Sequence, residues 1–186
     1  MGHGGNVIAE LTTDHREVAG LFDEVQALPP GAPRRRELVD EFTIELVRHS
    51  VAEEEYLYPA VREHVPGGGP IADKEISDHA AVERLLKELE GMEATDSRFD
   101  MLVEQVVSEV RQHVADEEQN LFPALERACS PDTLNELGDQ VRRAKKLAPT
   151  RPHPSAPDTP PANKLLAPGA GLVDRARDLV TGRGRS

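Results

Sequence analysis

The chain has 186 residues, one cysteine, no tryptophan and a net charge of −12. Its charges are unevenly divided between an acidic body and a basic tail. Residues 1–149 contain 16 Lys and Arg against 31 Asp and Glu, whereas residues 150–186 contain 6 Lys and Arg against 3 Asp and Glu. Phosphate backbones would repel the acidic body, so we do not expect it to bind nucleic acid. The start of the sequence does not resemble a secretory leader, no apolar run approaches the ~20 residues that span a bilayer, and a lone cysteine is typical of a reducing compartment, so we expect a cytoplasmic protein.

Apolar residues recur at steps of three and four, which is the period of an amphipathic helix. This pattern predicts four long helices: residues 6–28, Pro33 to about residue 64, a third that ends near Gly91, and a fourth that begins at Thr95 or Asp96. The segments PPGAP and PGGGP separate the first three, because proline and glycine interrupt helices. Four long helices with short connections predict an all-α, up-down antiparallel four-helix bundle.

A shorter fifth helix is predicted over residues 130–147, since Ser-Pro is typical of a helix start. Residues 148–161 are rich in proline, which predicts an extended linker. Residues 171–183 have the pattern of a short, basic amphipathic helix, although a tail of this composition is more typical of a flexible segment, and the sequence names no partner for it. We therefore divide the chain into a helical domain (residues 1–147) and a linker with a basic tail (residues 148–186).

The two helical hairpins of the predicted bundle are copies of each other. A shift of 64 residues, without insertion, superimposes His15 on His79, His49 on His113, Glu53 on Glu117, and Pro59 on Pro123. Each copy supplies one histidine from its first helix and a His-x-x-x-Glu pair from its second. Residues four apart lie on the same face of a helix, and here that face is the apolar one.

Six polar side chains therefore occupy positions where a bundle normally places leucine. A buried carboxylate without a partner is strongly destabilising, so these groups need compensation. One explanation is a metal-free core with His–Glu hydrogen bonds. The other is a nitrogen–oxygen site for one or two transition-metal ions, in which the carboxylates can bridge two ions.

Four segments resemble the hemerythrin-like, or HHE cation-binding, domain family over residues 6–128: DHREVAGLFDEV, HSVAEEEYLYPAV, DHAAVERLLKEL and HVADEEQNLFPAL. The resemblance implies a four-helix bundle around two non-haem iron ions that are bridged by an oxo or hydroxo group. These irons would bind or react with O2, peroxide or nitric oxide. Carried over by position, His15 and His49 would bind one iron, and His79 and His113 the other. Glu53 and Glu117 would bridge them. The composition suggests a bacterial protein.

One position departs from the oxygen-carrying hemerythrins, which place a second histidine four residues after the third-helix histidine. Here that position is Glu83, and its counterpart in the first copy is Ala19. Glu83 is either a surface residue or an additional ligand on the His79 side. An anionic ligand would favour ferric iron, and so peroxide chemistry or sensing over reversible oxygen carriage.

Two tyrosines follow His49. Tyr56 lies two helical turns further on the same face, so it is a candidate for a contact with the centre, although a core tyrosine with its hydroxyl at the rim is the simpler explanation of the position. Tyr58 is nine residues past His49, and a regular helix would point it away. Asp14 and Asp78 precede the first-helix histidines and are expected at the surface.

Three functional interpretations remain from the sequence. The leading one is a di-iron protein that meets O2, H2O2 or nitric oxide, most concretely a catalase-like protein that decomposes peroxide during oxidative stress. The second is a non-enzymatic sensor or binding protein for oxygen, nitric oxide or iron, with the basic tail as its output. The third is a structural bundle that holds a redox-inactive metal such as zinc.

Overall fold

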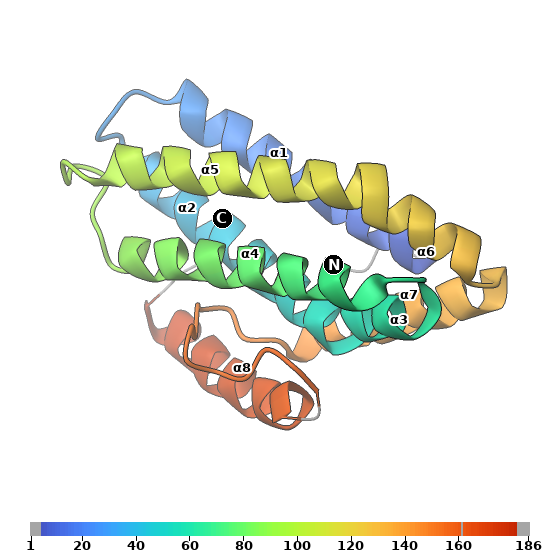
Figure 1. The fold of residues 1–186 in the computed structure, drawn as a ribbon. Helices are drawn as coiled ribbons and strands as arrows, with labels where there is room; N and C mark the ends of the chain where they lie inside the picture. Colours follow the sequence, from blue (N-terminus) through green and yellow to red (C-terminus); the bar gives the residue numbers. More distant parts are fainter. Residues whose placement is uncertain (1–4, 161, 182–186) are drawn as a thin grey trace.

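The computed structural model describes residues 5–160 and 162–181, and all regular secondary structure in these residues is helical. Four helices form the bundle: α1 (Val7–Ala27), α2 (Pro33–Ala52), α4 (Gly68–Leu89) and α5 (Phe99–Asp116) (Figure 1). The up-down four-helix bundle is thus confirmed. No helix in the described part of the chain combines the length and the apolar character that crossing a bilayer requires.

Two of the long helices change their winding in the middle. α2 continues through a π-helical turn, η1 (Glu53–Leu57), into α3 (Tyr58–His64). α5 continues in the same way through η2 (Glu117–Leu121) into α6 (Phe122–Ala128). These turns occur at equivalent places in the two repeats, and each begins at a glutamate of the His-x-x-x-Glu pair.

Local interactions explain most of the helix ends. The Asn6 side chain accepts a hydrogen bond from the Ala9 backbone N–H and caps α1. Gly67, before α4, has a φ of 74°, a conformation that favours glycine. The expected start of the fourth helix at Thr95 or Asp96 is too early, because the Asp96 carbonyl accepts the Phe99 N–H in a turn and α5 begins only at Phe99.

The core consists of two clusters of buried side chains. One cluster contains, among others, Val18, Phe22, Phe42, Leu46, Val82, Leu86, Phe99 and Val110. The other contains, among others, Leu11, Leu57, Tyr58, Val61, Leu121, Phe122, Leu125 and Val141. Along each long helix, the polar residues of the repeat lie between these clusters, so a polar layer crosses the middle of an apolar bundle.

α7 (Pro131–Leu147) is the predicted fifth helix and packs against α1 and α2. The Ser130 side chain accepts from the Thr133 backbone N–H and caps it, as the sequence indicates. Leu134 and Val141 on α7 join the second core cluster. α7 therefore completes the core at that end of the bundle.

The C-terminal segment contains a longer helix than the sequence predicts. α8 spans Ala162–Thr181 and includes the predicted helix except for residues 182 and 183, which lie outside the described residues. The Arg151 guanidinium donates to Asp178 Oδ1 (2.7 Å) in α8 and to Glu90 Oε1 (2.9 Å) at the end of α4. The proline-rich stretch is thus fixed to the bundle through buried polar contacts rather than through an apolar core.

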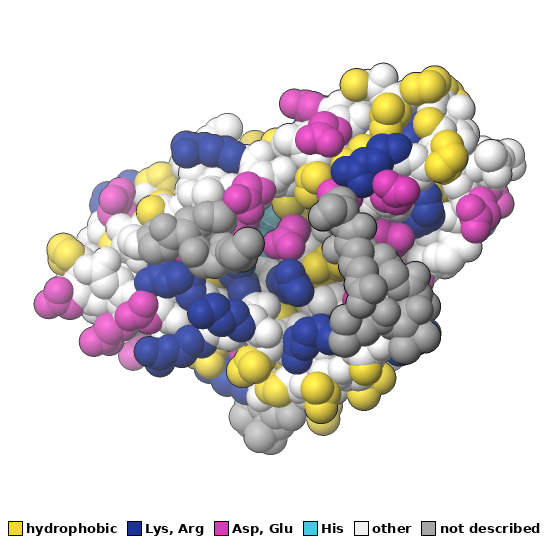
Figure 2. All heavy atoms as spheres, turned by 180° about the vertical axis from the view of Figure 1, so that it is seen from behind, with side chains coloured by type: hydrophobic (Ala, Val, Ile, Leu, Met, Phe, Trp, Pro, Cys, Tyr) yellow, Lys and Arg dark blue, Asp and Glu magenta, His cyan; other side chains and the backbone are white. Residues whose placement is uncertain are grey.

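The charges are unevenly distributed over the surface. Figure 2 shows the side opposite to that of Figure 1, where Lys and Arg side chains gather over the lower middle of the face. The chain as a whole carries a net charge of −12. This face of an acidic protein thus carries a group of basic side chains.

Two glycine substitutions should change the free energy of unfolding in opposite directions. Gly138 lies at the close contact between α7 and the start of α1, whereas Gly20 lies on the exposed side of α1. A Cβ at Gly138 would lie 2.8 Å from the Gly5 carbonyl oxygen and 3.0 Å from the Val7 nitrogen. We expect Gly138→Ala to lower the free energy of unfolding by about 1–3 kcal/mol. Gly20→Ala, on the exposed side of α1, should raise it by about 0.5–1 kcal/mol. Urea unfolding measures both, and equal stability of the two variants would contradict this packing.

The ion pair between Glu90 and Arg151 predicts a pH-dependent contribution to stability. Burial alone would raise the pKa of Glu90, but hydrogen bonds from Lys87 and Arg151 outweigh it and lower the pKa from 4.5 to about 2. A carboxyl with a lowered pKa stabilises the folded chain above its unfolded pKa, and this contribution is lost as the pH falls through the folded pKa. We expect Glu90→Gln to destabilise the metal-free protein above about pH 5, and the difference from wild type to shrink toward about pH 2.

Urea unfolding at a series of pH values measures this difference. Glu88→Gln is the matched control, because Glu88 pairs with Arg98 on the exposed side of the bundle, where a single ion pair contributes little. A Glu90→Gln difference that stays constant down to about pH 2 would contradict the assignment.

Candidate metal centre

Four buried histidines meet in the polar layer, one from each long helix. His15 lies on α1, His49 on α2, His79 on α4 and His113 on α5. The Nε2 atoms of His15 and His49 are 3.2 Å apart, and those of His79 and His113 are 3.1 Å apart. The fold therefore pairs the histidines as the repeat predicts.

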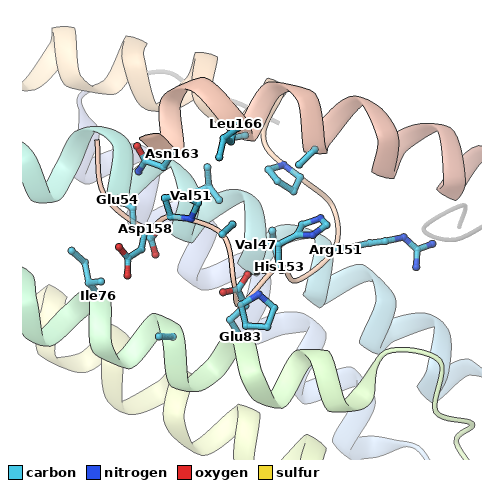
Figure 3. Close-up of a pocket in the computed structure, with 17 residues that line it drawn as sticks. Val47, Val51, Glu54, Ile76, Glu83, Arg151, His153, Asp158, Asn163 and Leu166 are labelled. Carbon is cyan, nitrogen blue, oxygen red and sulfur yellow. Dashed lines mark hydrogen bonds between the residues drawn. The ribbon is translucent and has the colours of Figure 1, made fainter. Parts of the chain in front are cut away.

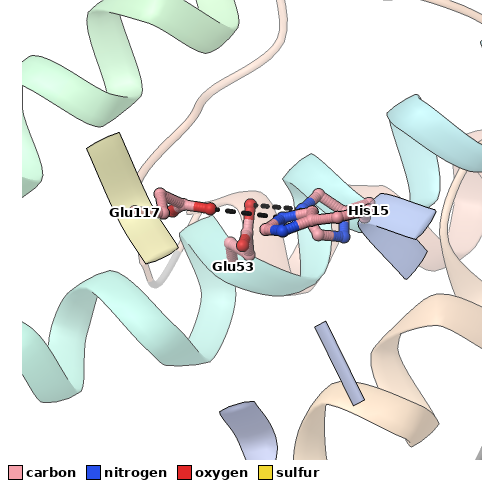
Figure 4. Close-up of side chains that lie close together, drawn as sticks. His15, Glu53 and Glu117 are labelled. Carbon is pink, nitrogen blue, oxygen red and sulfur yellow. Dashed lines mark hydrogen bonds and ion pairs between the residues drawn. The ribbon is translucent and has the colours of Figure 1, made fainter. Parts of the chain in front are cut away.

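The two repeat glutamates lie between the histidine pairs. Glu53 Oε2 is 3.2 Å from His49 Nε2 and 3.3 Å from His79 Nε2. Glu117 Oε2 is 3.5 Å from His15 Nε2 and 3.6 Å from His113 Nε2. Figure 4 shows Glu53 and Glu117 pointing toward His15. Each carboxylate thus reaches one histidine of each pair, which is the position of a bridging ligand.

The π-helical turns bring a tyrosine into this layer, so the expectation that Tyr58 points away is wrong. In η1 the Tyr58 N–H donates to the Glu53 carbonyl, five residues back, whereas an α-helix would use a residue four back. This places Tyr58 over Glu53. The Tyr58 hydroxyl lies 3.0 Å from His79 Nε2, 3.1 Å from Glu117 Oε1 and 3.4 Å from Glu53 Oε2.

The same turn in the second repeat brings a phenylalanine into the equivalent place. Phe122 donates its N–H to the Glu117 carbonyl, and its ring stacks on His15 with centroids 5.7 Å apart. A phenylalanine ring has no hydroxyl. The centre is therefore chemically asymmetric, with a hydroxyl on the His79 side and an apolar ring on the His15 side.

Each histidine ring has a carboxylate beside its outer nitrogen. The Nδ1 contacts are His15 with Glu118 (2.8 Å), His49 with Asp14 (3.2 Å), His79 with Glu54 (3.0 Å) and His113 with Glu75 (2.9 Å). Such contacts fix the orientation of a ring and leave Nε2 free to bind a metal. All four Nε2 atoms consequently face the middle of the layer.

Two of these carboxylates are not identified by the sequence reasoning. Asp14 is buried and orients His49, so the expected surface role is wrong for it, whereas Asp78 pairs with Lys74 at the surface as expected. Glu75 precedes His79 by four residues on the apolar face of α4, a signal that could have identified it.

A buried lysine connects α7 to the centre. Lys145 Nζ donates to Asp14 Oδ1 (2.5 Å) and to Glu10 Oε1 (2.9 Å), and all three side chains are at most 7% exposed. The same Asp14 carboxylate contacts His49 through its other oxygen. The positive charge of Lys145 on α7 therefore compensates the Asp14 carboxylate that orients His49. Residue spacing does not indicate this contact, because the two residues are far apart in the sequence.

The side chains of Glu83 and Tyr56 both contact the C-terminal segment. Glu83 Oε1 accepts a hydrogen bond of 2.7 Å from the His153 backbone N–H. Tyr56 is half-buried, and Lys164 Nζ lies 3.9 Å from the centre of its ring.

Burial and close charges control protonation in the layer. Burial by itself lowers the pKa of His49, but the Glu53 and Asp14 carboxylates outweigh it and hold the pKa well above its ordinary value. Burial likewise opposes protonation of His79, yet Glu53 and Glu54 raise its pKa to about 10. Burial raises the pKa of Glu53, but the adjacent histidines hold it well below its ordinary value. The metal-free layer thus contains imidazolium–carboxylate pairs whose protons a cation would displace.

Tyr58 keeps its proton in this environment. Burial, followed by the negative charges of Glu117 and Glu53, raises the pKa of Tyr58 well above its ordinary value. The phenol is therefore a hydrogen-bond donor inside the layer.

The donor atoms fit a metal. Glu53 Oε1 and Glu117 Oε2 are buried and have no hydrogen-bond partner among the described residues, which is unusual for buried carboxylate oxygens. Three sets of ligand atoms lie within 4.8 Å of one another: His15, His49, Glu53 and Glu117; Glu53, His79 and His113; and Glu75, His113 and Glu117. Glu53 and Glu117 each belong to two sets, and a mixture of imidazoles and carboxylates suits iron and similar ions.

The model of the family described as hemerythrin HHE cation binding domain matches residues 6–148. The chain belongs to this family. Its histidines and glutamates are therefore those of a cation-binding domain, and the resemblance noted in the sequence is confirmed.

The chain is also similar to individual proteins. An uncharacterized hemerythrin-like protein of Schizosaccharomyces pombe is 29% identical over 168 residues, which cover 90% of this chain and 82% of that protein. A protein of Nostoc named DNA nickase is 28% identical over 141 residues, and the chain spans only 39% of its length. A solved hemerythrin HHE domain-containing protein from Mycobacterium kansasii has the same fold, with a TM-score of 0.66 at 22% identity over 76% of this chain and 85% of that one.

The link from α7 to His49 yields a prediction for this hemerythrin-like domain. Lys145→Met leaves Asp14 and Glu10 without their buried cation, so we expect a loss of about 3–5 kcal/mol in the free energy of unfolding. Affinity for ferrous iron should fall by about tenfold, because Asp14 no longer holds the His49 ring. Urea unfolding and iron titration measure the two effects. Lys146→Met, at the exposed neighbour, is the control, and a Lys145→Met protein that matched it would contradict the connection.

Proposed function

We propose that this domain binds two iron ions in a non-haem centre and uses them to bind or decompose a small oxidant, either O2, hydrogen peroxide or nitric oxide. The observation that carries the proposal is the position of Glu53 and Glu117, each within 3.6 Å of Nε2 atoms from both histidine pairs. A site for one ion would not need two carboxylates placed between two separate pairs.

Each residue has a defined part in the proposed centre. His15 and His49 would hold one iron, His79 and His113 the other, and the two glutamates would bridge them. The bound ions would supply redox and Lewis-acid chemistry. The apolar clusters on both sides of the layer exclude water, which strengthens the electrostatic interactions inside it.

Tyr58 favours peroxide decomposition among the candidate reactions. Its hydroxyl lies 3.1 Å from Glu117 Oε1, so it is placed to donate its proton to an oxygen atom at the centre. Decomposition of peroxide needs no external reductant, because two peroxide molecules give two waters and one O2. A proton donor fixed by a π-helical turn supports turnover more than simple carriage of O2.

A sensor is the second candidate, and one contact favours it. Glu83 on α4, four residues from His79, accepts a hydrogen bond from His153 in the C-terminal segment. A change in α4 when a ligand binds would reach this segment directly. Ligand-dependent protection of residues 148–186 from proteolysis would be its signature.

Oxygen evolution tests the proposal. Protein loaded anaerobically with ferrous iron should release O2 from added peroxide, and Tyr58→Phe should reduce the rate by tenfold or more, because loss of a general acid typically reduces a rate by about 10²–10⁴-fold. Tyr56→Phe is the matched control, since Tyr56 contacts Lys164 instead. Both variants should retain their iron.

The other outcomes distinguish the alternatives. Iron-loaded protein that releases no O2 but binds nitric oxide, with a change in tail proteolysis, would favour the sensor. A colourless protein that retains zinc and rejects iron would overturn the di-iron proposal.

A further inference from the structure

Three cavities lie in a row between the histidines and the C-terminal segment. The innermost, of about 20 Å³, is lined by all four histidines and by apolar residues of the first core cluster. The second, of about 40 Å³, shares Leu46, Ser50, His79 and Val82 with the first. Shared walls show that the two spaces are adjacent, and both touch His79.

The third cavity continues the row toward the surface. It measures about 90 Å³ and shares Val47, Val51, Glu54 and Glu83 with the second. Leu166 also lines it and is 56% exposed, so this cavity reaches the outside of the molecule. Figure 3 shows the third cavity, between α2 and α4 on one side and the C-terminal segment on the other.

The C-terminal segment forms the roof of the third cavity. Residues on both sides of its bend line the space, including Arg151, His153 and Asp158 before α8 and Asn163, Ala167 and Ala170 within it. Buried contacts hold the roof in place: Arg151 binds Glu90 and Asp178, and the His153 N–H binds Glu83. This gives a physical role to Glu83, which replaces the alanine of the first repeat.

We propose that this row of cavities is the path by which the small oxidant reaches the metal centre, and that residues 149–160 and 162–170 roof it and limit the size of what enters. The inference rests on the proposed function, because it assumes that a ligand must reach the histidines. A space of 20 Å³ accommodates little more than one water-sized molecule. The path therefore suits ligands of about two heavy atoms, a class that includes O2, nitric oxide and hydrogen peroxide.

The path runs on one side of the bundle, between α2 of the first repeat and α4 of the second. Val47 and Ala80, which line the third cavity, correspond in the other repeat to Arg111 and Arg16. Arg111 is engaged with Asp23 at the surface. Larger, charged side chains thus stand where the equivalent path would begin, and the ligand approaches the centre on the His79 side.

The walls of the path are mixed in polarity. Val47, Val51 and Ile76 are apolar, whereas Glu54 and Asn163 offer polar groups. The Asn163 Nδ2 atom is buried and has no hydrogen-bond partner among the described residues. A donor of this kind can accommodate peroxide as well as an apolar gas.

Tyr58 and the innermost cavity lie on opposite sides of the polar layer. Val18, Leu46 and Val82 line the innermost cavity and belong to the first core cluster, whereas Tyr58 belongs to the second. A ligand that arrived through the path would meet the ions on one side, with the phenol on the other. Entry and proton donation are thus separated in space.

Filling the third cavity tests the path. Ala170→Phe places a large ring in it, and Ala176→Phe, on the exposed side of α8, is the control for the size change. Crystals of the metal-free wild type under xenon should show xenon in the third cavity, and Ala170→Phe should remove it. This readout requires neither iron nor activity.

In iron-loaded protein, nitric oxide binding is then followed by stopped-flow. Ala170→Phe should slow both association and dissociation by the same factor, at least tenfold, and leave Kd unchanged, because a blocked path alters the barrier and not the end states. Ala176→Phe should match the wild type. Ala167→Phe fills the same cavity from a neighbouring position and should repeat the result if Ala170→Phe folds poorly.

Two results would overturn the path. One is a wild-type association rate in a variant whose crystal shows the ring in the cavity. The other is a change in Kd as large as the change in association rate. If iron-loaded wild-type protein binds no nitric oxide or peroxide at all, the proposed function fails instead, while the xenon result still reports whether the cavity admits a small molecule.

Discussion

The burial of four imidazoles and two carboxylates in the middle of an apolar bundle is the constraint on which the rest of this structure depends. Each imidazole has a carboxylate beside its outer nitrogen, and Asp14 in turn has Lys145. The accessory helix α7 thus belongs to the electrostatics of the layer as well as to its packing. Glu53 Oε1 and Glu117 Oε2 remain buried without a hydrogen-bond partner among the described residues, and a cation would bind them.

The internal repeat explains the ligands, and the departures from it suggest how the centre is used. Tyr58 and Phe122 occupy equivalent positions after the two π-helical turns, so of these two positions only the one beside His79 has a hydroxyl. Glu83 replaces an alanine of the first repeat and holds the C-terminal segment. Proton donation and ligand access, as we infer them, both depend on residues that break the symmetry near His79.

The sequence predicts the bundle, because the helical period of the apolar residues shows which face of each helix is buried. The 64-residue repeat then identifies the six central polar residues on those faces. The prediction from sequence fails at Tyr58, since a π-helical turn shifts the side chain by one position and the periodic pattern does not reveal the shift. It fails at Asp14 because the partner, Lys145, lies on a distant helix. The docking of the C-terminal segment on the bundle is not predicted, because polar contacts of Arg151, and not an apolar stripe, fix it there.

The most direct test of the centre is a crystal structure of the iron-loaded protein with anomalous diffraction at the iron edge. We predict two iron peaks, one beside His15 and His49 and the other beside His79 and His113, with Glu53 and Glu117 contacting both. A single peak, or iron bound away from these glutamates, would contradict the di-iron assignment.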